Sequence, residues 1–313
     1  MLKVKGGQAN ALRCPQSELR GTEKLNDMLG IVNTSNLSAM PANRLGVGDL
    51  GNALLAETPG SAARIAIVEE AVRRGINTNY ASSWHMVRSG FKFTFQNTPA
   101  APVRVDDTGG LKDFGNTAGP LTLRRIEAAS VPASNIALLA DAAPGDAREA
   151  LLSDTINDEL PAGSRLSESF NDGPAFFNGT GVELLKDDYP PVRATIPQAF
   201  PTVGTTVNST NVTAYASTTA AAALGVQLIL QDTRDWYAQH GDKCFVLMAD
   251  GSVKTLTDTN GDGFLNPGFP VEGVTDPALT VGYTDGLVEI DNFEVFTGAL
   301  LNPELYQKAD FEN

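Results

Sequence analysis

The chain has 313 residues, of which 42% are hydrophobic and 14 are Phe, so it can form one large folded domain or two modest ones. Its formal net charge is −14 at pH 7, from 37 acidic and 23 basic residues. This balance argues against nucleic acid and anionic membrane surfaces as main partners, because both select for Lys and Arg. With only 19% charged residues and many Ser, Thr, Asn and Gly, the composition is common among extracellular β-rich proteins.

The amino-terminal third predicts helices. Residues 8–31 carry leucines at helical spacing, although an internal Pro and Gly argue against one long helix. The clearest helix follows, with an apolar stripe over 65–72. Either Thr58 or Ser61 can cap its start, and Gly75 is well placed to end it.

The remainder is dominated by short runs with strand character, bounded by turn residues. These candidate strands are 80–87, 91–95, 121–126, 134–140, 226–230, 244–249, 252–256, 287–290 and 293–296. Residues 156–220 predict a loop-rich insertion, since they are rich in Gly, Pro, Asn, Ser and Thr and have few periodic runs. Strands outnumber helices, so we predict an α+β fold with helices on one side of an antiparallel sheet. We expect a single domain over 1–313, with 1–60 as an amino-terminal segment.

The most informative stretch is 238–267. An apolar run at 244–249 and an alternating run at 252–256 flank Asp250-Gly251. Asp-Gly between two such runs is a strong hairpin signal, because Gly accepts the positive φ of a type I′ turn. We expect Asp250 to cap this turn through nearby backbone N–H groups.

A calcium-loop pattern follows the hairpin directly. Asp258, Asn260 and Asp262 occupy positions 1, 3 and 5 of an EF-hand-type loop, and Gly263 stands at the required sharp turn. Phe264 would offer its backbone carbonyl at position 7. These hard oxygen ligands suit calcium better than transition metals.

The pattern is incomplete, because Phe269 stands at position 12, where a bidentate Glu is expected. A carboxylate from elsewhere must close the site, and the sequence does not rank the candidates. They are Glu272, Asp285, Glu289 and Asp291. The alternative is an Asp/Asn/Gly-rich turn without metal.

His240, nine intervening residues and Asp250-Gly251 form a recognisable signature. It resembles that of the prepilin-type processing-associated His-x9-Asp-Gly (H-X9-DG) domain family of pseudopilin-like bacterial envelope proteins. Residues 13–15, 78–84 and 232–237 agree with the same family. The resemblance implies a pilin-like head with a central antiparallel sheet, enlarged by long insertions, and a structural role.

The start of the chain departs from the family pattern. Relatives of this kind carry a cleaved leader and a long hydrophobic helix, whereas no stretch here approaches the ~20 apolar residues of a membrane span. A signal peptide is not visible at residues 1–7 either. We expect that the hydrophobic helix was removed from this chain, with a natively unanchored member as the alternative.

The two cysteines, Cys14 and Cys244, lie near opposite ends of the sequence. We expect a disulfide between them, which would close a long loop and require an oxidising compartment. The alternative is a pair of unrelated buried thiols.

Catalytic motifs are weak. We expect His240 to hold the loop before the hairpin by a hydrogen bond, because no nucleophile motif such as G-x-S-x-G accompanies it. Trp84, Trp236 and Tyr237 are expected in the core, with a sugar- or protein-binding surface as the alternative.

The sequence and the resemblance together favour a non-enzymatic structural protein. We expect a pseudopilin or minor pilin-like component of a type II secretion system, a type IV pilus-like system or an extracellular filament. Its partners would be other pilin-like subunits or the secretion machinery, and its location the cell envelope or the outside of the cell. The first alternative is a secreted polysaccharide- or protein-binding module, and the second is an unrecognised hydrolase.

Overall fold

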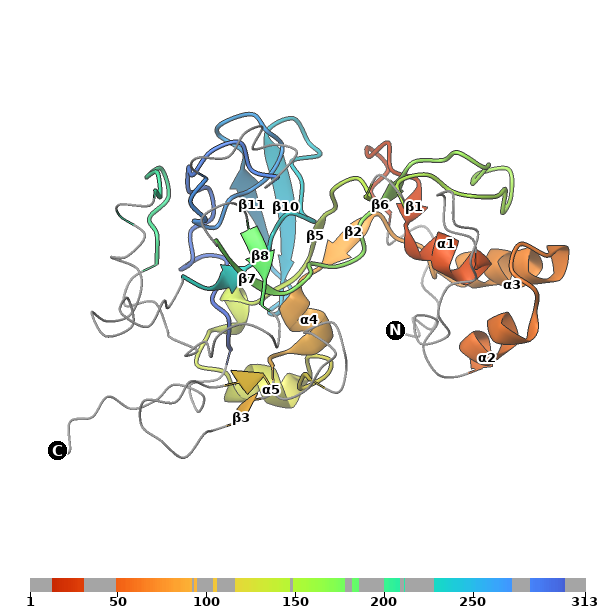
Figure 1. Ribbon diagram of the computed structural model, residues 1–313, viewed down its shortest axis with the longest axis horizontal. Coiled ribbons are helices and arrows are strands. Elements are labelled where there is room, and N and C mark those ends of the chain that lie inside the picture. The colour runs from red at the N-terminus through yellow and green to blue at the C-terminus, as the bar shows by residue number, and fades with distance from the viewer. Residues whose placement is uncertain are drawn as a thin grey trace. The chain divides into compact units, whose positions relative to one another are not determined.

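The computed structural model of this chain divides into two compact units, whereas we expected one domain. Unit 1 comprises Met1–Ala81 and Asp141–Ser169, and unit 2 comprises Ser82–Ala140 and Phe170–Asn313 (Figure 1). Within them the structure describes residues 13–30, 49–91, 93–94, 104–105, 116–146, 149–177, 182–185, 200–208, 211, 228–271 and 282–301. Each unit is described here by itself.

Unit 1 is built from three helices and a short parallel strand pair. The helices are α1 (Lys24–Leu29), α2 (Asp49–Ala56) and α3 (Ala62–Arg73), and the strands are β1 (Gly21–Thr22) and β6 (Leu166–Ser167). Their apolar faces meet in one core, which includes Leu25, Leu29, Leu54, Val68, Leu152, Leu160 and Leu166. The predicted helix over 65–72 is therefore confirmed as α3.

Local capping explains where α3 begins and how α1 is held against it. Ser61 is the cap, since its Oγ accepts the Arg64 backbone N–H at 3.2 Å. The buried Arg64 guanidinium then donates from Nε to the Met28 carbonyl at 2.6 Å and from Nη1 to the Glu57 carbonyl at 3.2 Å. Burial lowers the Arg64 pKa, and the carbonyl at the end of α1 offers a favourable partner for the cation.

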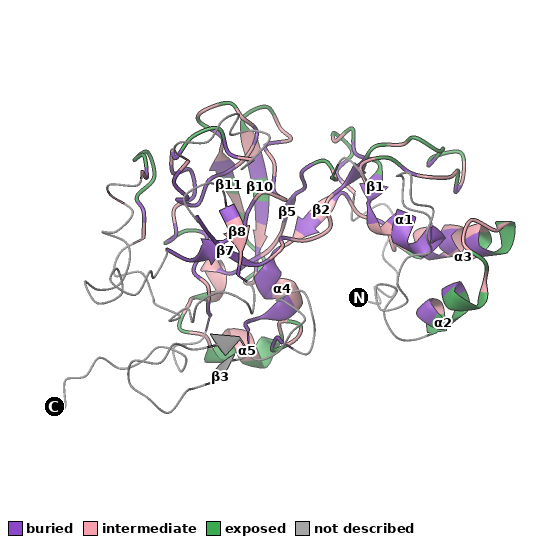
Figure 2. Ribbon diagram, viewed as in Figure 1, coloured by how far each residue is buried: buried purple, intermediate pink, exposed green. Residues whose placement is uncertain are grey.

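Unit 2 carries most of the strands. A four-stranded sheet has the order β11 (Val253–Thr257), β10 (Lys243–Met248), β5 (Ala137–Asp141) and β2 (Tyr80–Ser82). Strand β10 pairs antiparallel with β11 and with β5. The boundary between the units falls inside β2, after Ala81, and inside β5, after Ala140. Figure 2 shows buried residues running along β10 and through α4 (Trp84–Arg88).

Smaller elements complete unit 2. They are a three-stranded sheet of β8 (Val182–Leu184), β7 (Pro174–Phe177) and β9 (Leu230–Gln231), the pair β3 (Phe93–Thr94) and β4 (Arg104–Val105), helix α5 (Leu123–Ala128) and a 3-10 turn at Ala133–Asn135. A few helices together with mainly antiparallel strands confirm the predicted α+β class. None of the helices among the described residues is long and apolar enough to cross a membrane.

Four strand predictions are wrong in whole or in part. Residues 80–87 form only the short strand β2, because Ser83 then caps α4 by accepting the Met86 N–H at 3.0 Å. Residues 121–126 fall largely in α5 instead of a strand. In 287–296, Leu287 makes an isolated bridge with Thr206 and a turn follows, so neither predicted strand forms.

The hairpin at 244–256 is confirmed as β10 and β11, but its turn differs from the predicted one. Met248 N–H donates to the Ser252 carbonyl at 2.8 Å, which leaves a three-residue loop of Ala249, Asp250 and Gly251. Only Gly251 of the three has a positive φ, of 86°. A type I turn closed by a left-handed Gly matches this arrangement, because a type I′ turn would need positive φ at two successive residues.

The side chain of His85 is enclosed in the core of unit 2. Its ring lies 5.7 Å from that of Trp84 and 6.0 Å from that of Phe296, centroid to centroid, and Nε2 lies 3.1 Å from the Gly298 carbonyl. Burial lowers the His85 pKa to about 4, against an ordinary value of 6.5. The folded unit therefore holds this imidazole neutral.

This burial predicts an acid-sensitive contribution to stability. Because the pKa of His85 is lower in the folded state than in the unfolded state, neutral His85 stabilises the fold fully above pH 6.5, and this stabilisation is lost as pH falls toward 4. The free energy of unfolding should fall by up to about 3 kcal/mol over this range. In His85→Gln, whose amide stays neutral, this part of the pH dependence should disappear. Urea unfolding of both proteins between pH 7 and 4 measures it. A wild-type-minus-variant difference that stays constant with pH would contradict the assignment.

Candidate metal centre

The loop that follows β11 is organised by the buried carboxylate of Asp258. The hairpin ladder continues into this residue, whose N–H donates to the Asp242 carbonyl at 2.9 Å. Its Oδ1 accepts the Gly261 N–H at 2.6 Å, and its Oδ2 accepts the Gly263 N–H at 2.8 Å. One side chain thus closes the loop at both of its glycines.

The close approach of Tyr237 explains why Gly stands at position 263. Gly263 has φ of 85°, and a Cβ added there would overlap the Tyr237 ring. That ring packs edge-on against Phe264, 5.3 Å between centroids, while the Gly263 carbonyl accepts the Ala238 N–H at 2.8 Å. The segment before His240 therefore supports one wall of the loop.

Asp262 connects the loop to a segment that comes later in the sequence. Its Oδ1 accepts the Phe264 N–H at 2.8 Å, and its Oδ2 accepts the N–H and hydroxyl of Thr284 at 2.9 and 3.0 Å. Asn260 lies beside it, with Oδ1 accepting the Asp262 N–H at 3.1 Å and Nδ2 donating to Asp285 Oδ1, also at 3.1 Å. The side chains of Asp258, Asn260 and Asp262 therefore bond to the loop's own backbone or to residues 284–285.

Glu289 supplies the third carboxylate. It is only 5% exposed, and its backbone N–H donates to the Asn266 carbonyl at 2.9 Å. Its Oε1 accepts the Thr259 N–H at 2.7 Å, and its Oε2 accepts the Asn266 N–H at 3.2 Å. The side chain thus spans the loop from its second residue to its end.

These contacts bring three carboxylates together. Oxygens of Asp258, Asp262 and Glu289 all lie within 4.8 Å of one another. Burial raises the Glu289 pKa, and the nearby Asp262 charge raises it further, although the backbone donors oppose both effects. Among the described residues, the hydrogen bonds and ion pairs to these carboxylates include none from Lys or Arg.

The donor set fits a hard divalent cation. The three carboxylates are oxygen ligands, and each carboxylate oxygen that accepts one N–H keeps further lone pairs. A cation would also offset the mutual repulsion of three charges in a partly desolvated loop. The chemistry of the residues present therefore agrees with the calcium pattern of the sequence.

The structure ranks the candidates for the missing ligand. Glu289 joins the group, whereas Asp285 accepts from Asn260 and from the Leu287 N–H. Asp291 accepts the Phe293 N–H in a separate turn, and Glu272 lies outside the described residues. Phe269, at position 12 of the pattern, is fully buried in an apolar cluster.

The residues of the His-x9-Asp-Gly signature have structural contacts. The His240 ring lies 5.0 Å from that of Phe245, and the backbone N–H of His240 donates to the Lys243 carbonyl at 3.1 Å. Asp250 caps the turn as predicted, since Oδ1 accepts the Ser252 N–H at 2.9 Å and the Ser252 hydroxyl at 2.6 Å. The Ser252 hydroxyl above all lowers the Asp250 pKa.

The predicted disulfide is not present. Cys14, in unit 1, and Cys244, in unit 2, are both buried thiols. Cys244 stands on β10 opposite Leu256 and is fully buried. Cys14 is held by Asn79, whose Oδ1 accepts its N–H at 2.7 Å.

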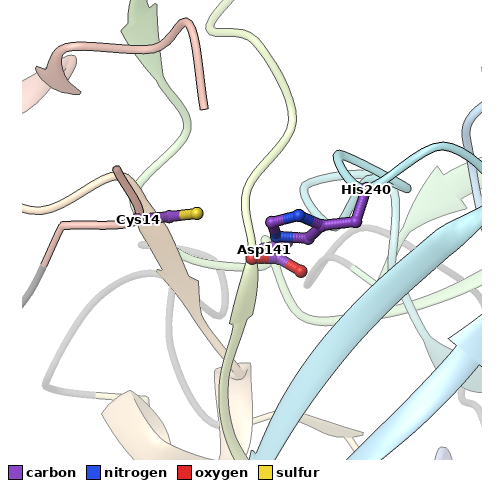
Figure 3. A group of neighbouring side chains, drawn as sticks. All are labelled: Cys14, Asp141 and His240. Atoms are coloured by element: carbon purple, nitrogen blue, oxygen red, sulfur yellow. The ribbon is translucent and has the colours of Figure 1, made fainter. Parts of the chain in front are cut away.

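Figure 3 shows the side chains of Cys14, Asp141 and His240. Within unit 1, the Cys14 sulfur and a carboxylate oxygen of Asp141 lie within 4.8 Å of each other. Beside them, burial above all raises the Tyr80 pKa, with Cys14 and Asp141 adding to the effect. His240 belongs to unit 2.

The predicted core aromatics are confirmed for the two tryptophans. Trp84 and Trp236 are 0% and 3% exposed, and neither can offer a face to a sugar ring. Tyr237 is partly buried against the carboxylate loop. Neither tryptophan therefore offers the exposed ring that would favour a polysaccharide-binding groove.

Fold and site together define an α+β protein whose central hairpin leads into a carboxylate-rich loop. A family model described as "Protein of unknown function (DUF1559)" matches residues 119–263, a range that includes the whole hairpin and ends inside the loop. Comparison with the curated proteins and with the solved structures found no match.

The packing of Tyr237 on the loop makes a prediction with a matched control. Gly261 and Gly263 both have positive φ, but a Cβ at 261 meets nothing within 4 Å, whereas one at 263 overlaps the Tyr237 ring. Gly261→Ala should lower the free energy of unfolding by about 1 kcal/mol, because of backbone strain. Gly263→Ala should lower it by at least about 2 kcal/mol more, because the added Cβ overlaps the Tyr237 ring. Chemical denaturation of both variants measures the difference, and equal losses would show that Tyr237 does not constrain the loop.

Proposed function

We propose that this chain is a non-enzymatic structural component of the bacterial envelope. It acts as a pseudopilin or minor pilin-like protein in a type II secretion system, a type IV pilus-like system or an extracellular filament. Its partners are other pilin-like subunits or the secretion machinery.

The observation that carries this proposal is that side chains of the His-x9-Asp-Gly signature and of the following loop make structural contacts. Asp250 holds the hairpin turn, and Asp258 and Glu289 hold the backbone of the following loop. His240 packs on Phe245 at the start of the same hairpin. The carboxylates that would be candidates for acid–base chemistry are thus engaged with backbone N–H groups, as expected of a scaffold.

Two further facts support the proposal. The family match covers residues 119–263. The pilin-like interpretation of that region comes from its His-x9-Asp-Gly signature, which resembles that of the H-X9-DG domain family. Unit 2 also exposes several large apolar side chains that a packing role can use, among them Leu123, Val253 and Phe293, which are 70%, 62% and 79% exposed.

We further propose that the loop 258–266 binds calcium through Asp258, Asp262 and Glu289, with Asn260 and the Phe264 carbonyl completing the site. The bound ion would fix the loop against the 284–289 segment, and so stabilise the part of unit 2 that follows the hairpin. This assignment rests on the three carboxylates within 4.8 Å and on the order of oxygen ligands in the motif.

Photo-crosslinking tests the structural role. A photoreactive residue in place of Phe293 or Val253, in the full chain expressed in its own bacterium, should form adducts with pilin-like subunits or secretion components. Mass spectrometry identifies the adducts, and the unsubstituted chain illuminated in parallel is the control. Adducts confined to cytosolic proteins, or turnover of a substrate by the purified chain, would contradict the proposal.

Calorimetric titration of chelator-treated protein tests the calcium site. The full chain should bind calcium and its melting temperature should rise with calcium concentration. Glu289→Gln removes one ligand charge and should weaken binding at least about tenfold.

Glu294→Gln is the matched control for this titration, because Glu294 is exposed on the adjacent turn, outside the carboxylate group. It should bind calcium like the wild type. Absence of binding heat together with an unchanged melting temperature in the wild type would remove the calcium assignment and leave the structural role standing.

A further inference from the structure

The two most exposed large apolar side chains among the described residues both lie in unit 2. They are Phe293, which is 79% exposed, and Leu123, which is 70% exposed. Single exposed apolar residues are common on protein surfaces and need no explanation by themselves. These two differ from such residues in their neighbours, because acids stand beside Phe293 and arginines beside Leu123.

A short turn, residues 291–294, holds Phe293 in a fixed position. Asp291 Oδ1 accepts the Phe293 N–H at 2.8 Å. The Asp291 carbonyl accepts the N–H groups of Glu294 and Val295 at 2.9 and 2.8 Å, and the Phe293 carbonyl accepts Asn135 Nδ2. A side chain on a turn that is already ordered loses little further conformational freedom when it docks, which suits it to act as an anchor.

The surroundings of Phe293 are acidic. Asp291 is half-buried and Glu294 is exposed, and neither carboxylate forms an ion pair with another described residue. Lys254 reaches the same turn, but its Nζ donates to the backbone carbonyl of Glu294. The turn therefore presents an aromatic ring beside two carboxylates that lack an ion-pair partner in the described part of the chain.

Leu123 lies on a surface of the opposite sign. It is the first residue of α5, a helix without a buried residue, which Figure 2 draws in pink and green. Ile126 follows three positions later, so the two apolar side chains lie on one side of the helix. Arg124 and Arg125 stand between them in the sequence, against the single acid Glu127. The helix thus offers an apolar strip with an excess of positive charge.

The two arginines of α5 differ from the other cations of unit 2. Each other basic side chain that the structure describes in this unit has a partner. The pairs are Arg88 with the Val87 carbonyl, Arg234 with Asp232, Lys243 with Asp242, and Lys254 with the Glu294 carbonyl. The guanidinium groups of Arg124 and Arg125 bond to no other described residue. In a chain with a net charge of −14, α5 is thus the described surface of unit 2 that attracts an acidic partner.

We propose that the 291–294 turn of one copy of this chain docks on α5 of a second copy. The Phe293 ring packs on the apolar strip that begins at Leu123, while the two acids of the turn face the two arginines of the helix. A second copy is the occupant because the chain itself carries both the acid-flanked ring and the surface that complements it. This contact rests on the structural role proposed above, and names one of its partners.

The contact joins two different surfaces, so it can repeat from copy to copy. A copy that has docked its turn still offers its α5 to the turn of another copy. A head-to-tail contact of this kind builds an open filament when its rotation does not close a ring. The proposal therefore assigns a specific surface of unit 2 to the assembly of a filament.

Photo-crosslinking of the purified full chain locates the contact. A photoreactive aromatic residue replaces Phe293, and this protein is mixed with isotope-labelled wild type at about 1 mM total, where weak contacts are populated. Adducts that carry both isotopes come from contacts between copies, and their labelled half should map to residues 121–130. Adducts that map elsewhere on the labelled copy would overturn the proposal, and so would a wild type that sediments as a monomer at this concentration.

Charge reversal tests the electrostatic part of the contact. Arg124→Glu places an acid opposite the acidic turn, and Glu294→Lys places a cation opposite the arginines. Each variant alone should therefore self-associate about tenfold more weakly than the wild type in sedimentation velocity. An equimolar mixture of the two should recover association, because each turn then finds a helix of opposite charge. A mixture that associates no better than either variant would overturn the proposal.

Asp242→Lys is the matched control for Glu294→Lys, because it makes the same change in net charge at an exposed site on the hairpin. It should self-associate like the wild type, and equal weakening in both variants would overturn the contact. Circular dichroism of each variant confirms that it is folded. Failure of this contact is distinguishable from failure of the structural role, since adducts with other envelope proteins in the cell test that role separately.

Discussion

Buried carboxylates that accept hydrogen bonds are the interaction on which much of this structure depends. Asp258 ties together the two glycines of its loop, and Glu289 ties that loop to a segment far along the sequence. A carboxylate that accepts two or more N–H groups fixes the backbone more firmly than an apolar contact, because hydrogen bonds to charged groups are directional and strong. The loop therefore needs little regular secondary structure to be specific.

The hairpin is the platform from which this loop is built. Strand β10 contributes Cys244, Val246 and Met248 to the core face, and β11 delivers the chain to Asp258 directly after its last residue. The Asp250 turn sets the register of both strands. An error at the turn would therefore displace the loop carboxylates, which links the His-x9-Asp-Gly signature to the candidate metal centre through geometry alone.

The sequence predicted what depends on local chemistry. Helix α3, the hairpin and the Asp258–Asp262 loop follow from caps, alternation and turn residues a few positions apart. Segments 80–87 and 121–126 were mistaken for strands because alternation over so few residues also fits a short helix once Ser83 or Thr122 precedes it. Glu289 could only be one of four candidates, since nothing local indicates which distant acid returns to a loop. The pairing of Cys14 with Cys244 likewise has no local signal in the sequence, because it depends on where two distant segments lie.

The two acidic groups of this chain meet one electrostatic problem in different ways. In unit 1 the buried Glu23 carboxylate has a counter-charge from its own chain, since its Oε1 accepts Lys24 Nζ at 2.6 Å and the Ser169 hydroxyl at 2.9 Å. In unit 2 the carboxylates of Asp258, Asp262 and Glu289 each bond to backbone N–H groups while their oxygens converge within 4.8 Å. The first arrangement is neutralised by a neighbouring Lys, and the second suits a divalent cation. In a chain with a net charge of −14, the two groups thus differ in whether the neutralising cation is a side chain of the chain itself.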